Sequence, residues 1–119
     1  MLLNFTIQNF EVFSNTVELC CEANMHTKKF LSNVIQHKQG NVLKSLAIYG
    51  PNNTGKTCII EALMAFRDVL LNKPLRFDSN IFVASPIIKL GAEFLWEDNR
   101  YLYDFSFNTK TKEFHYEKF

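Results

Sequence analysis

The fold is decided by residues 46–63, which read LAIYGPNNTGKTCIIEAL. Gly50, Gly55, Lys56 and Thr57 meet the pattern G-x-x-x-x-G-K-[ST] of a phosphate-binding loop. This spacing lets successive backbone N–H groups face a phosphate, while the helix that follows adds unpaired N–H donors and partial positive charge. The stretch therefore predicts a strand, a nucleotide-binding loop and a helix, in that order.

The predicted loop assigns roles in holding ATP and Mg²⁺. We expect Lys56 to reach the β- and γ-phosphates and stabilise their charge, and the Thr57 hydroxyl to ligate Mg²⁺. The backbone N–H of Cys58 is expected near the α-phosphate. The residues expected to contact nucleotide are Gly50, Pro51, Asn52, Asn53, Thr54, Gly55, Lys56, Thr57 and Cys58.

Apolar residues on both sides of the loop predict an α/β fold. The continuous apolar run 45–49 is typical of a strand buried on both faces of a parallel or mixed sheet. Residues 55–71 have helical periodicity. Because Ile60, Met64 and Leu71 widen the apolar face of this helix, we expect it to be largely buried.

The rest of the chain predicts antiparallel strands. Alternating apolar and polar residues predict a strand hairpin over 1–22 and a meander over 87–119. Between the hairpin and the segment 44–72 that carries the loop, residues 23–43 read as a long polar loop with at most one helical turn. The 119 residues amount to one domain.

The bulk charge gives no general argument for nucleic-acid binding. The net charge is +1 at pH 7. A local basic strip has two interpretations, a solvated loop or a surface facing DNA or a protein partner. Its members are His26, Lys28, Lys29, His37, Lys38 and Lys44.

The cysteines and the hydropathy indicate a cytoplasmic protein. Cys20, Cys21 and Cys58 form no disulfide framework and no zinc-binding spacing, which favours reduced thiols. No apolar run approaches the roughly 20 residues that span a bilayer. No membrane association is expected.

The acidic group that a nucleotide hydrolase needs is missing from its usual place. Such a carboxylate normally ends a buried strand, and no acid after the helix follows a run of four apolar residues. We interpret Glu61, one turn beyond Thr57, as a surface acid. The acids considered after the helix begins are Asp68, Asp78, Glu93, Glu97, Asp98, Asp104, Glu113 and Glu117.

Two long stretches, LLNFTIQNFEVFSNTVEL and LKSLAIYGPNNTGKTCIIEALMAFRDVL, resemble the amino-terminal part of ABC-type ATPases of the SMC-like branch. The resemblance is to the bacterial "AAA family ATPase" group, related to overcoming-lysogenization-defect nucleases and abortive-infection proteins. The matching features are the strand ending in Asn9-Phe10, the turn and second strand over 14–19, Asn52 in the loop, and the Tyr-x-Tyr element of Tyr101 and Tyr103.

The resemblance implies a P-loop NTPase half-lobe with a mixed sheet, one buried helix and an antiparallel meander. It also implies Mg²⁺-dependent ATP hydrolysis at a site completed across a dimer, in phage defence or DNA processing. The family's signature loop, second acidic motif, D-loop and switch histidine lie further along than residue 119. We therefore expect this chain to supply one side of one site, with a protein partner or a second copy supplying the other. Glu11 stands where the family often has a basic residue, so no phosphate or DNA contact is expected from it.

Two other functions remain open from the residues. One is a non-hydrolysing interaction module, or a truncated fragment, that docks on a partner through an unfinished sheet edge. The other is a small kinase or GTPase-like protein, which the hairpin before the loop and the lack of a guanine-reading motif disfavour.

Overall fold

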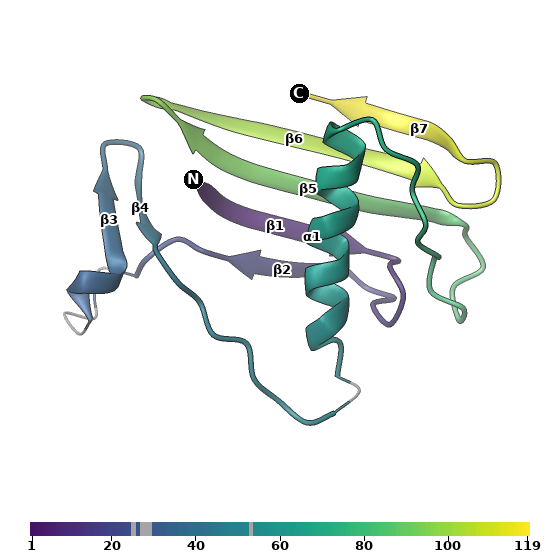
Figure 1. The fold of residues 1–119 in the computed structure, drawn as a ribbon, viewed down its shortest axis with the longest axis horizontal. Coiled ribbons are helices and arrows are strands. Elements are labelled where there is room, and N and C mark those ends of the chain that lie inside the picture. The colour runs from purple at the N-terminus through teal and green to yellow at the C-terminus, as the bar shows by residue number, and fades with distance from the viewer. Residues whose placement is uncertain (25, 27–29, 53) are drawn as a thin grey trace.

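A computed structural model of the chain describes residues 1–24, 26, 30–52 and 54–119. In these residues the chain forms one α-helix, one 3₁₀ turn and strands in two sheets (Figure 1). The elements are β1 (Leu2–Gln8), β2 (Val17–Cys20), η1 (Leu31–Asn33), β3 (Val34–His37), β4 (Gly40–Leu43), α1 (Lys56–Leu70), β5 (Ile87–Trp96), β6 (Asn99–Asn108) and β7 (Glu113–Lys118).

The main sheet has five strands in the order β2-β1-β5-β6-β7. The predicted hairpin is confirmed, since Phe5 of β1 faces Leu19 of β2 in an antiparallel pair. The predicted meander is also confirmed, with Leu90 of β5 opposite Phe105 of β6 and Asp104 opposite Lys118 of β7. Every strand pair among the described residues is antiparallel, so the expectation of a mixed sheet is wrong.

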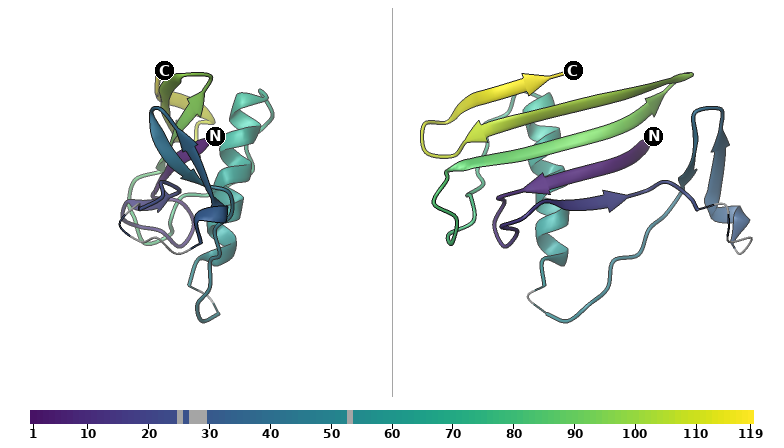
Figure 2. Two further views of the ribbon diagram at one scale, coloured as in Figure 1. Left: turned by 90° about the vertical axis from the view of Figure 1, so that its left-hand side faces the viewer. Right: turned by 180° about the vertical axis from the view of Figure 1, so that it is seen from behind.

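Helix α1 crosses one face of the main sheet and leaves the other face uncovered (Figures 1 and 2). Its buried residues are Ala62, Ala65 and Phe66. The Phe66 ring contacts the rings of Phe5 and Phe105, with centroids 5.5 Å and 5.8 Å away. The two alanines let the helix approach the strands closely, and the aromatic ring fills the space between them. The core is therefore a single layer between helix and sheet.

The helix is covered on one side only, which corrects the prediction that it is largely buried. Ile60, Met64 and Leu71 have 52%, 44% and 55% of their surface exposed. Helical periodicity gives the apolar positions, but the main sheet is the only sheet that packs on α1 within the described residues. The outer apolar side chains consequently face solvent.

The polar segment 23–43 contains more structure than a loop. The expected helical turn corresponds to η1, but β3 and β4 then form a small antiparallel hairpin, with Ile35 opposite Val42. Val42 is buried against Leu3 and Leu95, which anchors this hairpin to β1 and β5 of the main sheet. The prediction of a loop is wrong here because the strands are four residues each and carry few apolar side chains.

The predicted strand over 45–49 is absent. Residues 44–50 are exposed and form no strand. They belong to the coil that leaves β4 (Figure 1). Leu46 and Ile48 have 42% and 38% of their surface exposed. A strand that is apolar on both faces needs a sheet whose two faces are both covered. Among the described residues the helix covers one face of the main sheet only, and neither sheet includes this segment.

Candidate functional site

The predicted phosphate loop leads directly into helix α1, as expected. Gly55 is the N-cap residue, with φ of 92°, and the N–H of Ile59 donates to the Gly55 carbonyl at 3.1 Å. This left-handed backbone favours glycine. A Cβ at Gly55 would also lie 2.6 Å from the Phe13 ring. The second glycine of the motif is therefore required here by both backbone angle and close packing.

Lys56 and Thr57 occupy the first turn of α1. The Lys56 ammonium donates to the carbonyl of Gly50 at 2.7 Å and also to that of Pro51. The Thr54 hydroxyl donates to the same Pro51 carbonyl at 2.8 Å. The lysine thus folds back over its own loop, and Thr57 is exposed to solvent. Asn53, expected to contact phosphate, lies outside the described residues.

The first half of the loop is not preceded by the buried strand that the sequence predicts. Gly50, Pro51 and Asn52 are exposed and follow the coil of residues 44–50 rather than a strand. The helix start and its lysine are in place, but no sheet edge holds the other side of the loop in the described residues.

The acids expected as weak candidates for a catalytic group do not gather at the start of α1. Asp104 faces away from the helix, because its neighbour Phe105 packs on the helix side and adjacent strand residues point to opposite faces. It is half-buried rather than exposed, and its Oδ1 atom has no hydrogen-bond partner among the described residues. Glu93 is bonded to the Arg100 guanidinium, which lowers the pKa of its carboxyl.

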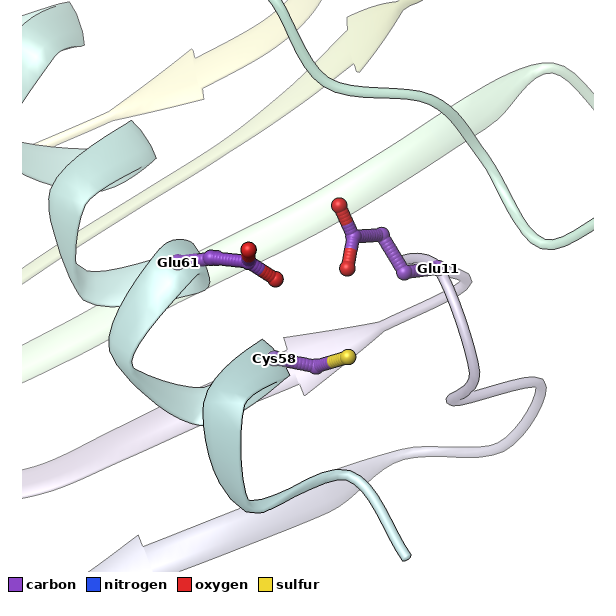
Figure 3. A group of neighbouring side chains, drawn as sticks. All are labelled: Glu11, Cys58 and Glu61. Atoms are coloured by element: carbon purple, nitrogen blue, oxygen red, sulfur yellow. The ribbon is translucent and has the colours of Figure 1, made fainter. Parts of the chain in front are cut away.

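Three side chains that the sequence does not connect meet beside the first turns of α1 (Figure 3). A carboxylate oxygen of Glu11, the Cys58 sulfur and a carboxylate oxygen of Glu61 all lie within 4.8 Å of one another. Glu11 comes from the turn after β1, and the other two lie one helical turn apart on α1. Glu11 lies about fifty positions before the other two in the sequence, so no local pattern predicts that they meet. Glu61, interpreted from the sequence as a surface acid, is half-buried here.

The electrostatics of this group favour protonated side chains. Burial, a hydrogen bond with Glu11 and the Glu11 charge together raise the pKa of the Cys58 thiol to about 11. The pKa of Glu61 is also raised, chiefly by its hydrogen bond with Glu11 and then by burial. Among the described residues no cationic side chain forms an ion pair with either carboxylate.

Three described members of the basic strip have local partners. The side chains of His37 and Lys38 lie 3.8 Å and 3.9 Å from the Asp98 carboxylate. The Lys44 ammonium donates to the Ser32 carbonyl at 2.7 Å. Lys28 and Lys29 lie outside the described residues. For the described members, the interpretation as a solvated loop with local partners is the better supported one.

A groove of about 790 Å³ lies on the sheet face that α1 leaves uncovered. Lys89, Asp104 and Ser106 are among the residues that line it, and none of the residues predicted to bind nucleotide does. The groove is therefore separate from the phosphate loop.

No family model, curated protein or solved structure matches this chain. Within the described residues, no helix is both long and apolar enough to cross a membrane.

Proposed function

We propose that this chain binds ATP·Mg²⁺ through residues 50–58, as one part of an ABC/SMC-like ATPase whose site is completed by other residues or by a partner chain. The observation that carries the proposal is the junction at Gly55 and Lys56. A left-handed glycine stands directly before the first turn of the helix, and the next side chain is a lysine that lies over the loop. Phosphate binding needs this combination of free helical N–H groups and a flexible cation.

The side chains in the first turn of α1 suit the ligand. Among the described residues, Lys56 is bonded to the backbone carbonyls of Gly50 and Pro51 alone, so a phosphate that replaces them gains a charge-assisted hydrogen bond. The exposed Thr57 hydroxyl would hold Mg²⁺, which would neutralise charge on the bound phosphates. In this proposal the chain binds and orients the nucleotide, while the group that activates water comes from elsewhere, because Asp104 lies on the far side of the sheet and Glu93 is held by Arg100.

The proposal predicts that Lys56→Ala weakens ATP·Mg²⁺ binding by about tenfold to 150-fold without unfolding the chain. A charge-assisted hydrogen bond to phosphate contributes about 1.5–3 kcal/mol, whereas the contacts of Lys56 in the free protein are exposed and contribute little to stability. Isothermal titration calorimetry measures the affinity, and circular dichroism checks the fold.

Lys73→Ala is the matched control, since Lys73 is exposed just beyond the other end of α1. It removes the same charge and should leave the affinity unchanged. Equal ATP affinity in the wild-type and Lys56→Ala proteins would refute the proposal.

A second function, a non-hydrolysing module that docks on a partner, is favoured by one observation. The apolar side chains of the coil 45–49 and of the outer side of α1 are exposed, including Tyr49 at 93% and Ile60 at 52%. Apolar surface of this kind is typical of a face that another layer covers. Phosphate release from ATP, measured with the chain alone and then with a complementary partner, distinguishes the two functions. Release that appears with the partner supports the ATPase, and no release in either case supports the docking module.

A further inference from the structure

The side chains of Glu11, Cys58 and Glu61 converge on one point. Figure 3 shows the thiol of Cys58 and the carboxylate of Glu61 directed from α1 toward the carboxylate of Glu11. The Cys58 side chain is buried, although its residue as a whole is half-buried at the helix start. The charges of both carboxylates oppose formation of the thiolate, so this group lacks a positive charge among its described neighbours.

Glu11 is held in place from a third segment. Its backbone has φ of 46°, its N–H donates to the Asp78 carbonyl at 3.3 Å, and its carbonyl accepts a hydrogen bond of 2.6 Å from the buried Asn80 side chain. The backbone N–H of Val12 also interacts with the Cys58 sulfur, where it favours the thiolate. These contacts fix the backbone of Glu11 beside α1, where its side chain lies next to Cys58 and Glu61.

We propose that Glu11, Cys58 and Glu61 bind a divalent transition-metal ion of the zinc class beside the first turns of α1. One thiolate and two carboxylate oxygens are a donor set that zinc accepts, and they leave a fourth position for water. Donors around tetrahedral zinc stand about 3.3–3.6 Å apart, so the present spread of up to 4.8 Å closes by small side-chain rotations. A cation at this point attracts both carboxylates and takes the place of the proton in the hydrogen bond between Glu11 and Glu61.

The site is different from the one proposed for Mg²⁺. Mg²⁺ prefers oxygen ligands and octahedral geometry, so a thiol at the centre of the group selects a softer ion. Metal binding requires loss of the thiol proton, so the affinity should decrease in acidic solution.

Cobalt(II) titration of the full chain, without nucleotide, tests the site. Co²⁺ occupies zinc sites and reports a bound thiolate by a charge-transfer band in the near ultraviolet. We expect this band in the wild-type protein and its displacement by Zn²⁺. Cys58→Ser should remove the band, whereas the double variant Cys20→Ser, Cys21→Ser should keep it.

The carboxylates have their own control. Glu11→Gln and Glu61→Gln should each weaken Co²⁺ binding by about tenfold or more, while Glu18→Gln, on the exposed side of β2, should not. Lys56→Ala should bind cobalt as the wild type does, which separates this site from ATP binding. No thiolate band, a band that survives Cys58→Ser in a folded protein, or unchanged affinity in both glutamine variants would overturn the proposal.

Discussion

Tyr103 shows how one residue joins the core to the edge of the sheet. Its ring packs on Phe66 with centroids 5.6 Å apart, and its hydroxyl donates to the Glu117 carboxylate of β7 at 2.5 Å. Burial, the hydrogen bond and the Glu117 charge raise the pKa of the Tyr103 phenol from 10.0 to about 12. The neutral tyrosine is therefore the form that the fold stabilises.

This shift predicts a loss of stability in alkaline solution. The pKa of the Tyr103 phenol is higher in the folded state than in the unfolded state. Its contribution to the free energy of unfolding is therefore complete below pH 10 and is lost as pH rises toward 12. The loss should be at most about 3 kcal/mol. Urea unfolding at several pH values measures it. Tyr103→Phe keeps the ring and removes the titration, so its free energy of unfolding should fall less steeply over this window, and equal slopes would contradict the assignment.

At the scale of the element, α1 is stabilised by one face and exposes another. Phe66 lies against Phe5, Tyr103 and Phe105, whereas Met64 has 44% of its surface exposed. The helix bounds of 56–70 agree closely with the predicted 55–71, because helical periodicity is a local property. The sequence does not predict which apolar residues of α1 are buried, because apolar residues occur around most of the helix. The position of the sheet decides which of them are covered.

The one-sided packing predicts unequal effects of truncation on this helix. Phe66→Ala should lower the free energy of unfolding by about 3–5 kcal/mol, because it opens a cavity between helix and sheet. Met64→Ala should change it by less than about 1 kcal/mol. Chemical denaturation of both variants measures the difference. Similar losses would mean that the outer side of α1 is also buried in solution.

At the scale of the whole molecule, the described chain folds around one sheet and leaves an apolar coil outside it. The residues of the main core come from β1, α1, β5, β6 and the turn at Phe10, and no buried apolar residue lies between residues 44 and 55. The segment predicted as a strand buried on both faces is thus outside the core. This arrangement agrees with the proposal that other residues, from a partner or a second copy, complete the nucleotide site.

We predict that charge placed in this coil leaves the fold intact. The double variant Leu46→Asp, Ile48→Asp should change the free energy of unfolding by less than about 1 kcal/mol, since both side chains are already partly exposed. Ile7→Asp is the contrasting variant, because Ile7 is fully buried and an unpaired charge there should prevent folding. Thermal denaturation compares them. A loss of several kcal/mol in the coil variant would show that the segment packs as a buried strand.

The sequence by itself determined the features that depend on neighbours along the chain. Alternation over a few residues predicts β1, β2 and the meander, and the spacing of Gly50, Gly55 and Lys56 predicts a loop that runs into a helix. Contacts between distant segments were decided only by the tertiary structure. It left residues 45–49 without strand partners, gave the hairpin of β3 and β4 a contact with Leu3, and brought Glu11 to Cys58 and Glu61. The physical reason is that periodicity records which side of an element is apolar, whereas burial depends on which other surface is present to cover it.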